Sequence, residues 1–232
     1  MKRISIGIDL DHVIRDINKQ IVKYYQKEFD EVFDLDDIDY SEDVMNTVCK
    51  FKNNKEKCIF LYEEYPLEIF GHAGQIERTL SRDLNAWIEK LGNQEEYDVD
   101  IFFYSMKEYN ITIQSSYFFI SKIGSRVRCT VFPKNFDELS RFGDVFITSY
   151  PDNAKELKKR KKNVILIKTK FNEGSEKYSD LKYDSFREFL NDENKLDKIS
   201  NLREEWKKAK KKNSLLTLMK SWLSYLRMMM KE

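Results

Sequence analysis

Two aspartates, Asp9 and Asp11, stand two residues apart directly after the apolar run 4–8. A short apolar run of this kind is typical of a buried parallel strand. Open α/β sheets bind their ligands at the carboxyl ends of such strands. Two close carboxylates are costly unless a cation lies between them or one is protonated, and Mg²⁺ suits oxygen ligands of this type. The alternative interpretation is a strand end with two solvated aspartates, because Asp is common in turns.

Three further predicted strands also end in polar residues, namely Ser105, Lys134 and the loop from Thr148 to Asp152. Together with the two aspartates, these groups suit phosphoryl transfer. Asp9 can accept a phosphoryl group as a covalent intermediate, and Asp11 can protonate the leaving oxygen. Ser105 and Lys134 can hold phosphate oxygens, and Mg²⁺ would offset the remaining charge. Each of these residues can also be an ordinary polar residue at the end of a strand, without a catalytic role.

The apolar pattern predicts an α/β fold. Strands are expected over residues 4–8, 99–104, 127–132, 144–147 and 164–168. Connections of helical length separate them, so we expect a five-stranded, Rossmann-like parallel sheet with helices on both faces. Helices are predicted at 16–29, as short pieces within 44–65, and at 75–91, 111–123, 136–141 and 152–162. The stretch at about 18–92 is far longer than an ordinary crossover, and it predicts a helical insert over the end of the first strand.

The composition narrows the classes of partner. Among 232 residues, 41 Lys and Arg balance 40 Asp and Glu. The basic runs at 155–162 and 207–212 are interpreted as solvated helix faces. Nucleic acid is therefore not expected as a partner. Three cysteines without CxxC spacing predict a reducing compartment with neither disulfides nor zinc. No apolar run is long enough to span a membrane, and the start lacks the layout of a signal peptide. We therefore expect a cytoplasmic protein or a component of a viral particle assembled there.

The last forty residues differ in character from the rest. Residues 1–192 are predicted to form the core with its insert, and residues 193–232 a helical extension. Within the extension, residues 215–230 are strongly apolar and rich in methionine. Such a helix either packs on the core or binds another chain, so a protein partner through residues 193–232 is expected. The abundant Lys, Asn, Ile, Tyr and Phe have AT-rich codons, a bias common in phages and in AT-rich bacteria.

The ordered motifs resemble those of the haloacid dehalogenase (HAD) superfamily of phosphatases over roughly residues 1–190. IGIDLDHVIRD is similar to its first motif, which implies Asp9 as nucleophile and Asp11 as acid/base, with the backbone carbonyl of Asp11 on the metal. Ser105 at the end of FFYS matches the second motif and Lys134 in VFPKN the third. GDVFITSYPDN aligns with the fourth. DLDxVIRD followed by an insert resembles 5′(3′)-deoxyribonucleotidases, in which a helical cap gives substrate choice.

Two positions depart from that family's pattern. His12 stands where the family usually has glycine. Thr148 and Ser149 stand where the fourth motif carries acidic metal ligands, which leaves Asp152 in the next turn as the remaining carboxylate. The resemblance thus implies Mg²⁺ held by Asp9, Asp11 and Asp152.

Two functions follow from these observations. The first is Mg²⁺-dependent hydrolysis of a phosphomonoester, possibly a nucleotide. The second is a catalytically decayed HAD fold reused as a structural or assembly module, for example in a phage particle, which docks through its C-terminal helices.

Overall fold

The computed structural model describes residues 2–32, 34, 37–39, 44–106, 110–202 and 204. The chain divides into two compact units, residues 1–193 and 194–232. In the second unit, residues 195–202 are helical. The expected apolar helix at 215–230 lies outside the described residues.

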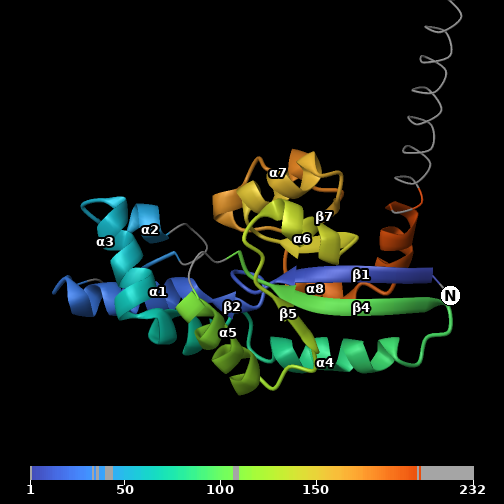
Figure 1. The fold of residues 1–232 in the computed structure, drawn as a ribbon, viewed down its shortest axis with the longest axis horizontal. Helices are drawn as coiled ribbons and strands as arrows, with labels where there is room; N and C mark the ends of the chain where they lie inside the picture. The colour runs from blue at the N-terminus through green and yellow to red at the C-terminus, as the bar shows by residue number, and fades with distance from the viewer. Residues whose placement is uncertain are drawn as a thin grey trace, which may run out of the picture. The chain divides into compact units, whose positions relative to one another are not determined.

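The first unit is a mixed α/β structure around a parallel six-stranded sheet, compatible with a Rossmann-like fold (Figure 1). Its strands are β1 (Lys2–Asp9), β4 (Tyr97–Tyr104), β5 (Cys129–Val131), β6 (Val145–Thr148), β7 (Asn163–Ile167) and β8 (Leu181–Tyr183). They lie in the order β5-β4-β1-β6-β7-β8. The central β1 pairs with β4 along its whole length and with β6 on its other side. The end of β1 is therefore surrounded by neighbouring strand ends.

Twelve helical segments are described in the first unit. They are α1 (Ile17–Glu28), α2 (Val44–Thr47), α3 (Asn54–Ile59), η1 (Phe60–Glu64), η2 (Leu67–Gly71), α4 (Leu80–Leu91), α5 (Asn110–Lys122), α6 (Phe136–Phe142), α7 (Pro151–Lys159), η3 (Lys170–Asn172), η4 (Glu176–Tyr178) and α8 (Phe186–Asn191). In the part of the chain that is described, none of the helices combines the length and apolar character needed to cross a bilayer.

The expectation of five strands was wrong, because β8 adds a sixth strand beside β7. It has only three residues, Leu-Lys-Tyr. A segment of this length gives no clear alternation of apolar and polar residues, so its pairing depends on the neighbouring strand rather than on its own pattern.

The helix expected at 75–91 begins five residues later than predicted, at Leu80. Gly74–Gln75 instead forms β3, which pairs antiparallel with β2 (Arg15–Asp16). Thr79 then has a φ of 73°, a left-handed conformation that a helix cannot include. The Gln75 side chain accepts a hydrogen bond from the Ser81 backbone N–H at 2.6 Å and so caps the start of α4.

Gly7 in the middle of β1 allows aromatic packing on one face of the sheet. A Cβ atom at this position would lie 2.7 Å from the Phe102 ring and 2.9 Å from the Phe146 ring. The two rings meet edge to face, with centroids 6.1 Å apart, and pack with Leu139 of α6 and Leu157 of α7. Glycine is therefore needed here for close approach rather than for backbone freedom.

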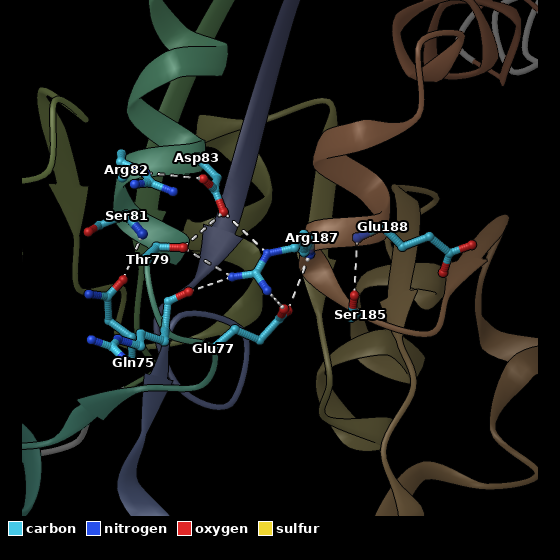
Figure 2. Close-up of polar contacts among 10 residues, drawn as sticks. Gln75, Glu77, Thr79, Ser81, Arg82, Asp83, Ser185, Arg187 and Glu188 are labelled. Carbon is cyan, nitrogen blue, oxygen red and sulfur yellow. Dashed lines mark hydrogen bonds and ion pairs between the residues drawn. The ribbon is translucent and has the colours of Figure 1, made fainter.

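Arg187 of α8 ties the core to the segment that leads from the insert into α4 (Figure 2). Its guanidinium lies 3.0 Å from Glu77 and 3.2 Å from Asp83, and it donates to the Arg78 carbonyl at 2.5 Å. An arginine that binds several acceptors on a loop and on the helix that follows it fixes this segment more firmly than an isolated surface pair does.

We expect Arg187→Met to lower the free energy of unfolding by about 1–2 kcal/mol, because charged hydrogen bonds are lost and Glu77 and Asp83 stay close together. Urea unfolding followed by circular dichroism measures this. The matched control is Arg82→Met, since Arg82 lies 3.7 Å from Asp83 with a side chain that is 78% exposed. The control should change stability by less than about 0.5 kcal/mol. Equal losses in the two variants would contradict the role given to Arg187.

Candidate active site

Asp9 and Asp11 lie at the carboxyl end of the central strand and are almost fully buried, with 1% and 3% of their surface exposed. The backbone turns back immediately after them. The Leu10 carbonyl accepts hydrogen bonds from the N–H groups of Ile14 at 3.2 Å and Arg15 at 2.8 Å. This tight turn brings Arg15 beside Asp11, although the two residues are not in a helix.

The Asp9 carboxylate is held by neutral donors. Its Oδ2 accepts hydrogen bonds from the Thr148 hydroxyl at the end of β6 and from the Asn153 amide in α7, each at 2.9 Å. Its Oδ1 accepts the Asp11 backbone N–H at 3.3 Å. Hydrogen bonds of this kind favour the ionised carboxyl. Burial and the nearby Asp9 carboxylate raise the pKa of the Tyr104 phenol well above its ordinary value, so this neighbour stays neutral.

The Asp11 carboxylate has a different environment, dominated by a buried cation. Its Oδ1 accepts the Arg15 Nε–H at 3.0 Å and Nη2–H at 2.7 Å, and its Oδ2 accepts the Ser105 hydroxyl at 2.8 Å. Arg15 has no exposed surface. Its Nη1 donates to the Phe70 carbonyl at 2.8 Å and to the Ser116 hydroxyl at 3.0 Å. Asp11 is therefore held as an anion, whereas a general acid must carry a proton.

The predicted site residues do not all meet. Asp9, Asp11 and Ser105 come together at one edge of the sheet, and Thr148 joins them. Lys134 is exposed. Its backbone N–H donates to Glu138 at 2.9 Å, and its ammonium group makes no ion pair within the described residues. Asp152 is also exposed, in the first turn of α7.

Sequence reasoning missed two residues that touch the aspartates, Arg15 and Asn153. Arg15 was visible within IGIDLDHVIRD, four residues after Asp11, but that spacing suggests an ion pair only in a helix. Asn153 adjoins Asp152, and helical geometry decides which of two consecutive side chains faces the sheet. Nothing in their residue types distinguished the two positions in advance.

An aromatic cluster borders the loop. His12 has a φ of 59°, a conformation that glycine adopts more easily, and only 8% of it is exposed. Its ring lies edge to face with Tyr150, at 5.0 Å between centroids, and with Phe171 at 5.4 Å. The bulky residue at this position is thus accommodated by packing against two aromatic rings.

The residues present do not fit the magnesium site that the resemblance implies. Mg²⁺ requires hard oxygen ligands, among them carboxylates with free lone pairs. Within the described residues, no group of three or more His, Cys, Asp or Glu side chains could hold a metal ion. The Asp11 carboxylate is already neutralised by Arg15, and Oδ2 of Asp9 accepts bonds from a hydroxyl and an amide.

Comparison with known proteins does not supply a family. A scan against protein-family models finds no match to the chain, and a search among curated proteins finds no relative.

We expect Arg15→Met to lower the free energy of unfolding by about 3–5 kcal/mol, because it leaves the Asp11 carboxylate buried without a counter-ion. The double variant Asp11→Asn/Arg15→Met removes both charges and should be more stable than Arg15→Met alone. Denaturant unfolding of the wild type, both single variants and the double variant measures this coupling. Additive losses would show that the two side chains do not interact.

Asn153→Asp should create the third carboxylate that a magnesium site lacks. We expect MgCl₂ to raise the melting temperature of this variant and to leave that of the wild type unchanged, because only a folded-state binding site stabilises the protein. Asp152→Asn/Asn153→Asp is the matched control, since it moves one carboxylate by one position without changing the net charge. A wild-type protein that Mg²⁺ stabilises as strongly as Asn153→Asp would refute this interpretation.

Proposed function

We propose that the chain is a HAD-like protein that binds a phosphomonoester at the carboxyl edge of its sheet, with Asp9 as the group that accepts the phosphoryl group. The observation that carries the proposal is the buried Asp9 carboxylate at the end of the central strand. Thr148 and Asn153 fix its orientation, and Ser105 lies on the same edge. A fixed, ionised carboxylate is a suitable nucleophile at phosphorus.

The chemistry divides between the two aspartates. An Asp9 oxygen attacks phosphorus and the bond from phosphorus to the leaving oxygen breaks, which gives an aspartyl phosphate. Water then attacks that phosphorus, which releases phosphate and restores the Asp9 carboxylate. Since Arg15 keeps Asp11 ionised, Asp11 can accept the proton of this water but cannot protonate the leaving group. Lys134 is exposed, and its ammonium group approaches the phosphate when substrate binds.

This division predicts a preference among substrates. A phenolate such as p-nitrophenolate leaves without being protonated, whereas the sugar alkoxide of a nucleotide needs an acid. The proposed activity is therefore higher toward aryl phosphates than toward nucleoside monophosphates, although the resemblance to nucleotidases suggests the opposite order.

A second function is favoured by a specific observation. Neutral donors occupy Oδ2 of Asp9, and Arg15 occupies Asp11, so both carboxylates are satisfied within the protein. This arrangement suits a HAD-like fold without activity that serves as an assembly module in the cytoplasm or in a viral particle. Its partner would bind through residues 193–232, most of which lie outside the described residues.

Hydrolysis assays separate the two functions. Full-length protein is incubated with p-nitrophenyl phosphate and with a panel of nucleoside monophosphates, with and without MgCl₂. We expect turnover of the aryl ester that Asp9→Asn reduces on the order of 10³-fold or more. Asp98→Asn, an exposed position at the opposite end of the sheet, is the matched control and should keep full activity. Turnover that survives Asp9→Asn, or none at all, would exclude the hydrolase and leave the assembly module.

A further inference from the structure

The edge of the sheet next to β4 is only partly covered. β4 has eight residues, and β5 has three, which pair with Phe102–Tyr104 (Figure 1). In the described part of the chain, no strand pairs with the other side of residues 97–101. At about 3.3 Å per residue, this leaves roughly 16 Å of strand edge open.

The open edge results from how the chain reaches β5. The Asn85 side chain in α4 donates to the Gly124 carbonyl at 2.8 Å and accepts the Arg126 backbone N–H at 2.7 Å. Arg126 also pairs with Glu89 of α4 at 3.0 Å. These contacts hold residues 124–126 against α4, so the chain joins β4 only at Cys129.

The backbone groups of successive β4 residues point alternately to the two sides of the strand, and the existing hydrogen bonds show which residues face the open side. The Leu10 N–H donates to the Tyr104 carbonyl at 2.9 Å, so even-numbered residues of β4 direct their backbone groups toward β1. The Ser105 N–H donates to the Val131 carbonyl at 3.3 Å, so odd-numbered residues face the β5 side.

Val99 therefore presents both its N–H and its C=O to the open edge, and Ile101 presents its N–H. These are the groups with which an added strand forms a ladder. Since they do not take part in the pairing with β1, binding there would cost no bond of the existing sheet.

A cleft of about 600 Å³ runs along this edge. Its lining includes the apolar side chains of Leu91, Val99, Ile101 and Val127, together with Phe142, which is 45% exposed. An extended segment placed here would thus bury apolar side chains as well as form backbone hydrogen bonds, and the two together give strand addition its affinity.

The cleft carries charges of both signs, since the exposed Arg126 and Arg128 also line it. On the face of β4 that carries Asp98 and Asp100, the acidic pair indicates the chemistry of the occupant. Asp98 and Asp100 are exposed and project from the same face of β4, since side chains alternate along a strand. Arg3 of β1 pairs with Asp100 at 2.9 Å, whereas Asp98 has no ion pair among the described residues. An added strand would place its own side chains about 5 Å from these carboxylates, where opposite charges stabilise the pairing.

A second copy of the chain fits this edge poorly. Antiparallel pairing of two β4 edges around Val99 would set Asp98 of each copy opposite Asp100 of the other, and like charges in direct opposition are destabilising.

We propose that residues 97–101 of β4 bind an extended peptide segment of another protein by strand addition. The segment has lysine or arginine at alternate positions, facing Asp98 and Asp100, and apolar residues between them that face Val99 and Ile101. The aliphatic stems of the basic side chains lie along Phe142.

The test uses the full chain and two labelled synthetic peptides, one that alternates valine and lysine and one that alternates valine and glutamate. Fluorescence anisotropy measures their affinities at physiological salt. We expect the valine–lysine peptide to bind more tightly by at least about tenfold. The double variant Asp98→Lys/Asp100→Lys should reverse that preference. Absence of saturable binding, equal affinity for the two peptides, or an unchanged preference in the double variant would overturn the proposal.

Val99→Pro tests the backbone contact separately. Proline removes the N–H that faces the cleft and leaves the pairing with β1 intact, so the fold should be retained, with a melting temperature close to that of the wild type. We expect this variant to lose at least about tenfold in affinity for the valine–lysine peptide. Unchanged affinity would overturn strand addition, and so would a wild-type dimer that Val99→Pro converts to monomer, because a second copy would then be the occupant.

Hydrogen exchange in the wild type provides a readout that does not depend on any variant. On addition of the valine–lysine peptide, the amides of Val99 and Ile101 should exchange more slowly, and the amide of Asp100, already bonded to β1, should not change. Protection that spares Val99 and Ile101 would place the peptide elsewhere and contradict the proposal.

Discussion

The buried guanidinium of Arg15 constrains the whole carboxyl edge of the sheet. A cation with no exposed surface is stable only when a counter-ion and further acceptors surround it. Asp11 supplies the charge, and the Phe70 carbonyl and the Ser116 hydroxyl supply the other acceptors. These groups come from the loop after β1, from the insert and from α5. Arg15 therefore links the docking of the insert to the electrostatics of the candidate site.

This interaction gives two neighbouring carboxylates different chemistry. Asp9 accepts hydrogen bonds from a hydroxyl, an amide and a backbone N–H, all neutral, and these bonds favour its ionised form. Asp11 forms an ion pair with Arg15, and this ion pair disfavours protonation of the Asp11 carboxylate. Environment separates their roles more strongly than spacing does, since the two residues are only two positions apart in the chain. The same environment occupies both oxygens of Asp11 and Oδ2 of Asp9, which leaves few free lone pairs for a divalent cation.

The sequence predicted what depends on local pattern. The apolar run before Asp9 indicated β1, the alternation of strands and helices indicated a parallel sheet, and the strand that ends at Ser105 placed this residue beside Asp11. It did not predict features set by tertiary contacts. β8 depends on pairing with β7, and α4 starts late because Gly74–Gln75 pairs with β2. Asn153 reaches Asp9 because its position in the first turn of α7 directs its side chain toward the sheet. This turn is polar, so the pattern of apolar residues does not indicate which of its side chains faces the sheet.

The two ends of β4 show how one strand can serve different purposes. At its carboxyl end, β5 completes the sheet and Ser105 is held in a buried network, so the geometry there is rigid. At its amino end, Asn85 keeps the approaching chain on α4, and the ladder stops short. Strands of other chains can pair unspecifically with an open edge of this kind, and exposed charges are a common means of preventing such pairing. Asp98 and Asp100 repel a second copy of the same edge, and the same two charges favour a strand with basic side chains. Protection against self-association and selection of a basic partner then have a single physical cause.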